Sequence, residues 1–518
     1  MTGMIRQYIS EAAGIAVLPP LDNNYKSGGG SVAVGACVVV ASKGEVGKII
    51  TVNADDWEDK LGRPLPMSQG PKAEGLRHLK DALDKLQFCN VVRIVAADAR
   101  FPSLSLSITK GTAPTKANHA YGTSLSIADA HWLQVFPVDG DPSTERRMTI
   151  SNIDPTKKRF RLSFEEKLQG EWKAIPAESF IVGVDVNDRD DSGLVAYLPV
   201  VLEERSTRFR AEIATTVDFD AVVENLEVIF DGGVNGGNPT VDEWKAAWDL
   251  LKTDDIDFNL CFAAGNYEPT AIAHMIKIAD GRLAQFRFDV PPWLTETAAA
   301  DWLASANLES YQASCSHYPY KASDEWYGGK SVWGASGAVT AAKALCLSTP
   351  TGHAAVKGAH YTAAGPKRGT INRRGIEALH MTGKLEPEQL VEARINPIAK
   401  GKIINDCLNV WYKENYLRFE HTTALLNDLC HEFLQESAIV QFEPDGLTMS
   451  TLQEIGDNIC KKRVEAGAFV DPRNPAKDGK VPYRVTVKQV AIDYMHVEFA
   501  YAETGVARRI GIQPRLMA

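Results

Sequence analysis

The chain has 518 residues, far more than one hydrophobic core can usefully serve, so its length predicts roughly three domains. Its composition, 44% apolar and 24% charged, is typical of folded globular proteins and argues against general disorder. The formal charge of −10 has the wrong sign for a partner with a phosphate backbone, and no apolar run approaches the roughly eighteen residues of a membrane-spanning helix, so we expect neither nucleic acid binding nor membrane insertion.

The N-terminal residues 1–22 predict an extended arm. A short apolar stretch there ends at a pair of prolines, and the glycine run that follows can serve as a flexible connector. The first thirty residues lack the basic start and the apolar core of a signal peptide. Synthesis in the cytoplasm is therefore expected. The apolar arm residues are Ile15, Val17 and Leu18, and the expected hinge residues are Gly28, Gly29 and Gly30.

Residues 31–97 predict a strand, a crossover and a second strand. The run 32–41 is almost wholly small-apolar and β-branched, which favours a strand covered on both faces. Leucines recur at helical spacing over 72–87, with charged residues between them, and predict an amphipathic helix. A second apolar run at 90–96 then completes an α/β unit.

The pattern changes between about 99 and 215. Short stretches of alternating polar and apolar residues are separated by Gly, Asp, Asn and Pro, which predicts a β-rich insertion. Its clearest expected strands are 104–108, 133–138, 159–164 and 180–184.

Strands and helices alternate again from about 224 to 300, which predicts an α/β layer. After a Gly-rich loop, Thr240 and Glu243 have the spacing of a capping box that begins a helix. The other expected elements are strands at 258–263 and 284–290 and a helix at 270–278.

The C-terminal region predicts helices followed by two strands. Its expected elements are a helix-like stretch at 403–418, amphipathic helices at 422–436 and 448–465, and alternating strands at 483–490 and 494–501. Beyond Gly505, a further expected hinge, the tail is short, basic and partly apolar, so it need not belong to the parent core. Its apolar residues include Val506, Ile510 and Ile512.

These patterns predict a multidomain α/β and α+β protein, with an α/β core built from both chain ends, a β-rich inserted domain and extended terminal arms. The expected segments are an arm 1–22, an N-terminal core segment 23–98, the β-rich insertion 99–215, an α/β middle domain 216–370, a C-terminal core domain 371–505 and a tail 506–518.

Candidate chemistry is sparse. Ser336 lies in a Gly-Ala-Ser-Gly string that only approximates a nucleophile elbow, and small-residue packing explains it better. His353 and His360 have no thiolate or carboxylate near them in sequence, and the eight cysteines are scattered singly, as buried thiols in a reducing compartment would be. The Gly-rich loop before Thr240 lacks the ending of a phosphate cradle. We therefore expect no catalytic, cofactor or metal site.

One basic cluster, Lys461, Lys462 and Arg463, lies on the last expected helix of this acidic chain. Complementing the helix dipole at a solvated helix end explains it more simply than a partner-binding patch does. The patch remains the second interpretation.

Two terminal regions resemble contractile tail sheath proteins of phages, tailocins and related injection machines. At the start, the strings VGACVVVASKGEVGKIITVNADDWEDKLG and HLKDALDKLQFCNVVRIVA are similar to that family's opening unit in order and spacing. Near the end, the string ARINPIAKGKIINDCLNVWYKENYLRFEHTTALLNDLCHEFLQESAIVQFEP and the strand YMHVEFAY resemble its C-terminal domain. In the middle region the string GGVNGGNPTVDEWKAAWDLL resembles the family only in outline.

The resemblance implies a structural subunit without enzymatic activity or cofactor. It would assemble as stacked hexameric rings around a tail tube, contact baseplate and tail terminator proteins, and contract to drive the tube through a target envelope. It would be assembled in a bacterial cytoplasm and reside in the tail of a virion or tailocin. The terminal arms would then be exchanged as strands between neighbouring subunits, and Lys461, Lys462 and Arg463 could face the tube.

Two other hypotheses remain. The first is an α/β hydrolase with a β insertion that uses Ser336 with His317 or His353. The second is a cell-surface or capsid-decorating protein, which would need no exchanged arms.

Overall fold

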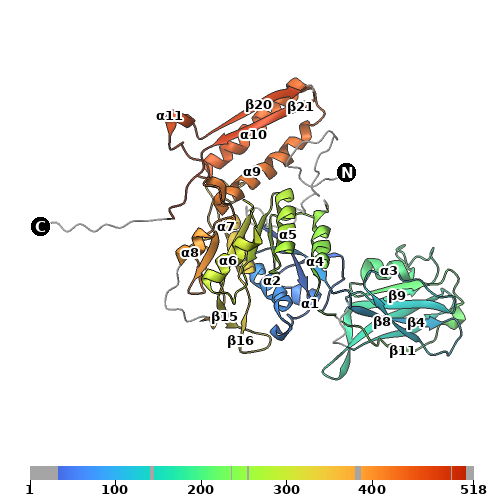
Figure 1. Ribbon diagram of the computed structural model, residues 1–518. Coiled ribbons are helices and arrows are strands. Elements are labelled where there is room, and N and C mark those ends of the chain that lie inside the picture. Colours follow the sequence, from blue (N-terminus) through green and yellow to red (C-terminus); the bar gives the residue numbers. More distant parts are fainter. Residues whose placement is uncertain are drawn as a thin grey trace.

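The computed structural model describes residues 33–139, 145–234, 236–253, 256–379, 387–491 and 493–508. It confirms a mixed α/β class with several sheets, the largest of them a mixed, mainly parallel sheet. Figure 1 shows an α/β body in the middle, a β-rich region beside it, and a unit of two long helices and a hairpin above it. We call this last region, residues 420–504, the C-terminal unit.

The body is built on an eight-stranded sheet in the order β19-β18-β14-β13-β12-β1-β3-β2. The predicted strand, crossover, strand unit is confirmed, because β1 and β3 pair in parallel from Val34 with Phe88 to Val40 with Ile94. The strands are β1 (Val34–Val40), β2 (Ile49–Val52), β3 (Phe88–Ile94), β12 (Leu260–Phe262), β13 (Gln285–Asp289), β14 (Ala313–His317), β18 (Ile395–Ala399) and β19 (Ile403–Ile404).

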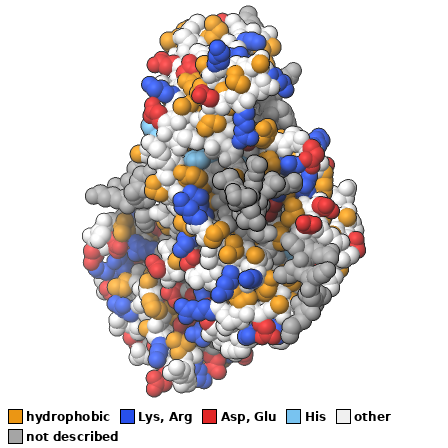
Figure 2. Space-filling model, turned by 90° about the vertical axis from the view of Figure 1, so that its left-hand side faces the viewer, with side chains coloured by type: hydrophobic (Ala, Val, Ile, Leu, Met, Phe, Trp, Pro, Cys, Tyr) orange, Lys and Arg blue, Asp and Glu red, His pale blue; other side chains and the backbone are white. Residues whose placement is uncertain are grey.

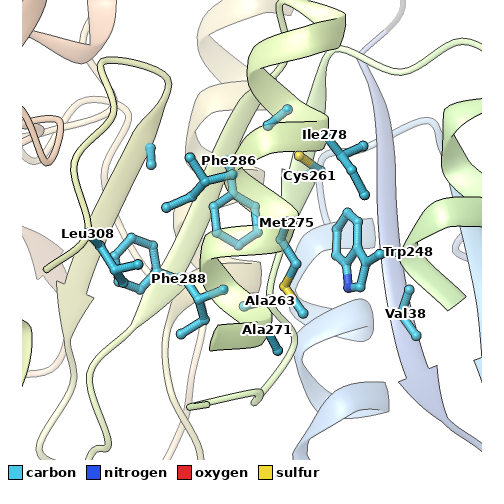
Figure 3. Close-up of a cluster of buried hydrophobic side chains, with 14 of the residues drawn as sticks. Val38, Trp248, Cys261, Ala263, Ala271, Met275, Ile278, Phe286, Phe288 and Leu308 are labelled. Atoms are coloured by element: carbon cyan, nitrogen blue, oxygen red, sulfur yellow. The ribbon is translucent and has the colours of Figure 1, made fainter. Parts of the chain in front are cut away.

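Helices cover both faces of this sheet, as the apolar run of β1 predicted. On one face, Val38 of β1 and Phe286 of β13 pack with Trp248 and Met275 of two covering helices (Figure 3). On the other face, Cys37 and Val39 pack against a different set of helices, because side chains alternate along a strand. The helices of the body are α1 (Trp57–Leu61), α2 (Gly75–Leu83), α4 (Val241–Asp249), α5 (Pro269–Arg282), α6 (Glu296–Ala306), α7 (Ser336–Ser348) and α8 (Pro387–Glu392).

The predicted capping box begins α4. Thr240 Oγ1 accepts the backbone N–H of Glu243 at 3.3 Å, and Glu243 Oε2 accepts the backbone N–H of Thr240 at 2.5 Å. The body also carries a small sheet of β15 (Tyr320–Ser323), β16 (Lys330–Val332) and β17 (Glu377–Ala378).

The β-rich region contains two four-stranded sheets that share one core. Phe164 and Phe209, from opposite sheets, stack with ring centroids 3.8 Å apart. Each of the four strands predicted here lies inside an observed strand, apart from at most one residue at its end, but the observed strands are longer than predicted. The sheets have the orders β10-β6-β4-β5 and β11-β7-β8-β9, from β4 (Arg100–Ser107), β5 (Thr115–Ala120), β6 (His131–Pro137), β7 (Arg146–Asp154), β8 (Arg159–Leu168), β9 (Glu171–Gly183), β10 (Phe209–Ile213) and β11 (Leu226–Ile229), with α3 (Leu198–Arg205) beside them.

The C-terminal unit packs a hairpin onto two helices, and the predicted helices and strands are confirmed. The second helix approaches the hairpin closely at Gly456, since a Cβ there would lie 2.7 Å from Val485 Cγ1. The elements are α9 (Glu420–Ser437), α10 (Asp445–Glu465), α11 (Pro475–Asp478), β20 (Tyr483–Ala491) and β21 (Tyr494–Tyr501).

The helix-like stretch predicted at 403–418 was wrong, because the structure has loops there apart from β19 and one short 3-10 turn, Tyr416–Arg418. Buried long-range hydrogen bonds hold the backbone in a non-helical path. The Asn396 side chain binds both backbone groups of Leu408, at 2.7 and 2.8 Å. The backbone N–H of Val410 donates to the carbonyl of Ala313 at 2.8 Å.

Candidate assembly site

The β20–β21 hairpin forms a sheet of only two strands within the described residues. Its register runs from Tyr483 opposite Tyr501 to Ala491 opposite Tyr494. Two-stranded sheets are marginal in water, and each strand presents an edge of backbone groups that another strand can pair with. The helices beneath the hairpin and a short bridge beyond Tyr501, between Phe469 and Glu503, add support.

The outward-facing backbone groups of β20 can be identified. The N–H of Ala502 donates to the carbonyl of Pro482, so Pro482 faces the partner strand. Because backbone groups alternate sides along an antiparallel strand, residues 483, 485 and 487 face the open edge. Consistent with this, the Val485 carbonyl accepts from the side chain of Gln453 instead of from β21, at 3.2 Å.

A groove of about 830 Å³ lies at the base of the hairpin. It is lined by the start of α9, the loop before β20, the end of β21 and the chain after it, including Thr422, Tyr501, Glu503 and Val506. Thr422 Oγ1 donates to Glu503 Oε1 at 2.6 Å, while Glu503 Oε2 has no hydrogen-bond partner among the described residues. Burial raises the pKa of Glu503. Within the described part of the chain, the groove therefore contains a buried acceptor, Glu503 Oε2, that is unsatisfied.

The C-terminal unit is fixed to the body by buried polar contacts. Glu420, the first residue of α9, accepts from Arg287 at 2.5 Å and from Lys343 at 3.2 Å, and the three side chains are at most 2% exposed. Two turns further, the side-chain amides of Gln312 and Asn427 exchange hydrogen bonds at 2.8 and 2.7 Å. Removing one partner of a buried ion pair is strongly destabilising, so these contacts matter for holding the C-terminal unit on the body.

Histidines next to this joint are kept neutral. Burial, followed by the nearby Lys343 ammonium, lowers the pKa of His360 and of His421 to about 4. Sequence reasoning missed the joint, because Arg287, Lys343 and Glu420 lie far apart along the chain, and it considered His360 only as a metal ligand.

The three basic residues 461–463 have different environments in the structure. Lys461 is exposed, and Lys462 pairs with Glu432 and Glu436 at 3.1 Å. The Arg463 side chain is 0% exposed and pairs with Asp428 and Glu432 of α9, each at 2.6 Å. Arg463 is therefore an internal tie between α9 and α10 and is not available to contact another chain in this conformation.

Most arm and hinge residues named from the sequence lie outside the described residues. These are Ile15, Val17, Leu18, Gly28, Gly29, Gly30, Ile510 and Ile512. Val506 is 37% exposed, and Gly505 lies against the Arg473 guanidinium.

Ser336 lies in a closed polar cluster at the start of α7. Its Oγ is 3.1 Å from Nδ1 of His78, not next to the histidines expected from the sequence, and His78 Nε2 is 3.3 Å from Glu74 Oε2. Nδ1 also accepts the N–H of Gly337, so Nε2 carries the proton and donates to Glu74. This resembles a triad, but the three side chains lie in the interior, each residue at most 1% exposed, and no substrate can reach the hydroxyl in this conformation.

The two histidines paired with Ser336 in the hydrolase hypothesis lie elsewhere. His317 Nε2 donates to the Leu294 carbonyl at 3.0 Å, and His353 is 3.8 Å from Glu465. Within the described ranges, no group of three or more His, Cys, Asp or Glu side chains could hold a metal ion.

The face shown in Figure 2 carries basic, acidic and hydrophobic side chains that are interspersed. This mixture selects no particular class of partner there. None of the helices in the described stretches of the chain is long and apolar enough to cross a membrane.

Comparison with known proteins supports the resemblance at the level of structure. No family model matches the sequence, and no curated protein matches it. The crystal structure of a sheath tail protein from Desulfitobacterium hafniense matches 94% of this chain and 100% of its own, with a TM-score of 0.51 at 14% identity. A sheath tail protein from Listeria innocua matches 92% of this chain and 96% of its own, with a TM-score of 0.51 at 12% identity. The chain therefore has the fold of tail sheath proteins.

Proposed function

We propose that this chain is the structural subunit of a contractile tail sheath. It polymerises as stacked hexameric rings around a tail tube and contracts to drive the tube through a target envelope, without an enzymatic role. The observation that carries the proposal is the β20–β21 hairpin, a two-stranded sheet that presents open edges and whose supporting helix α9 is joined to the body by a buried ion pair. The near-complete structural match to two sheath tail proteins supports it.

In this function the terminal arms of neighbouring copies add strands to the hairpin. Backbone pairing gives such contacts affinity without demanding a particular side-chain sequence, and it persists through large rotations if the connecting chain bends. The groove beside the hairpin offers the acceptor Glu503 Oε2 to the N–H or cationic group of an incoming segment. In this function the chain is divided into the six segments expected from the sequence, and residues 1–22 and 506–518 are the arms.

The other partners are the tail tube, the baseplate and the tail terminator. For the tube, Lys461 and Lys462 are the remaining basic candidates, because Arg463 is buried in ion pairs. Each such contact is exposed and weak, so only their sum over many subunits would hold the tube, and contraction could release it.

The direct test is electron microscopy of the purified chain, full length and with residues 509–518 removed. Hollow striated cylinders from the full chain and their loss on truncation are the expected results. A uniform monomer from the full chain at high concentration would contradict the proposed function. The truncation keeps Arg508 and its contact with the body, so its effect reports on the tail alone.

A further inference from the structure

Among the described residues, the chain after the hairpin is tied to the body by one ion pair. Arg508 Nε donates to Asp406 Oδ1 at 3.0 Å, and Arg508 Nη2 donates to Asp406 Oδ2. Two parallel N–H to oxygen bonds between a guanidinium and a carboxylate fix direction as well as distance. The side chains are 22% and 14% exposed, so this pair is far less solvated than an ordinary surface salt bridge.

Both partners of this pair are held in place. Asp406 Oδ1 also accepts the backbone N–H of Cys407 at 2.9 Å, which orients the carboxylate. The Arg508 guanidinium lies over the ring of Phe419, 5.4 Å from its centroid, just before α9 begins. The pair therefore forms at the junction of the body and the C-terminal unit.

The chain between β21 and Arg508 is fixed at its other end as well. The carbonyl of Ala502 accepts from Val470, and the N–H of Thr504 donates to Ala468, each at 2.9 Å. Gly505 follows at once, against Arg473. The hinge expected at Gly505 thus lies between two anchored points, and it cannot swing the tail while Arg508 is bound.

We propose that the Asp406–Arg508 pair is a releasable catch that sets where and in which direction the C-terminal tail leaves the subunit. This inference rests on the proposed function, in which that tail reaches a neighbouring copy. With the catch closed, ten residues follow the anchor at Arg508, and an extended chain of ten residues spans at most about 33 Å. With the catch open, thirteen residues follow the hinge at Gly505, and an extended chain of that length spans at most about 43 Å.

The catch gives the tail two geometries from one sequence. When the catch is closed, the tail begins at Asp406 on the body. This starting point limits which neighbouring subunit the tail can reach. When the catch is open, the tail can move away from the body. The hydrogen bonds of residues 502–504 within the C-terminal unit stay intact. Arg508 is in these terms a positioning residue for the tail.

A measurement on the monomer tests the catch independently of assembly. Spin labels at I510C and D478C, in a C430S background that removes the one half-buried native cysteine, report the distance between the tail and α11. We expect a narrow distance distribution in the parent and at least a twofold broader one in R508Q and in D406N. The charge swap D406R with R508D should restore the narrow distribution.

The matched control is R418Q, because Arg418 lies over the same Phe419 ring, 4.8 Å from its centroid, but pairs with Glu414. It should leave the distribution unchanged. Equal widths in the parent, R508Q and D406N would overturn the catch, as would broadening in R418Q as large as in R508Q.

Electron microscopy of the same variants tests the role in assembly. R508Q and D406N should give fewer or irregular cylinders, and the charge swap should restore them. Normal cylinders from variants whose distributions are broad would overturn the assembly role. If the parent itself forms no cylinders, the proposed function fails while the monomer measurement still decides whether the catch exists.

Discussion

Two edge strands of this molecule are treated in opposite ways. β9, at the edge of a sheet in the β-rich region, is interrupted by Pro176 and by Ala177, whose φ is 61°, and its register with β8 shifts there. β20 of the hairpin contains no proline, and its register shift, at 489–491, lies next to the turn. Proline and bulges are standard means of preventing edge pairing. The molecule thus blunts the edge of β9 and leaves the edges of the hairpin straight, as a strand acceptor requires.

The largest expected effect comes from blocking the open edge of β20. The N–H of Val487 faces outward, so Val487→Pro removes a donor from the edge without removing a ladder bond to β21. We expect the monomer to stay folded by circular dichroism while cylinders disappear. Thr486→Pro is the contrasting variant, since its N–H faces β21 and its loss should unfold the hairpin itself. Normal cylinders from Val487→Pro would contradict strand addition at this edge.

Acid should loosen the joint that holds the hairpin in place. The pKa of His360 and His421 is lowered to about 4, below the ordinary value of 6.5, so the unfolded chain binds protons that the folded joint excludes. Stability is therefore complete above about pH 6.5 and is lost as the pH falls toward 4. Melting temperatures measured from pH 7.5 to 4.5 should fall less steeply in His421→Gln than in the parent. Parallel curves would exclude His421 as a cause.

Straightening β9 should have a moderate effect of the opposite kind. Replacing Pro176 by Thr and Ala177 by Val removes both interruptions and exposes a long regular edge. The variant should self-associate without forming ordered cylinders, which light scattering at rising concentration would detect. The control is Lys173→Thr, on the same strand but outside the interruption. A monodisperse double variant would show that the two interruptions do not protect the edge.

The smallest expected effect is at Ser336. Ser336→Ala removes one hydrogen bond to His78, whose Nδ1 still accepts from Gly337, so we expect a loss of about 1 kcal/mol in the free energy of unfolding. Chemical denaturation measures this loss, and electron microscopy should show unchanged assembly. A hydrolytic activity in the parent that disappears in this variant would instead support the hydrolase hypothesis.

Local patterns in the sequence predicted much of the fold but not its long-range partners. β1, α2, β3, the capping box of α4 and the strands of the hairpin each have a periodicity or a spacing that identifies them. The pairing of β1 with its other neighbour, β12, has no such signal. β12 follows about two hundred residues later, and parallel pairing leaves no local pattern in the sequence. The helix expected at 403–418 failed for a related reason, since Asn396 of the preceding strand and Ala313 of a strand far earlier in the chain bind its backbone.

The candidate site divides in the same way. The hairpin and the tail were visible in the sequence, because alternation and a short basic end mark them. Glu420 was not, since a carboxylate at the start of a helix usually faces solvent and nothing nearby in the sequence announces Arg287 and Lys343. The burial of Arg463 was not predicted either, because a basic run on a helix does not reveal which of its side chains points into the interior.

The close approach at Gly456 has a mechanical meaning. A Cβ at this position would lie 2.7 Å from Val485 and 3.3 Å from Phe499, so the helix and hairpin meet at a notch one residue long. Residues three and four apart on a helix share a face, so sliding the hairpin along α10 would press these side chains against Gln453 or Cys460. A pull on either strand is therefore transmitted to α10 and, through the Arg463 ion pairs and α9, to the sheet of the body without slippage.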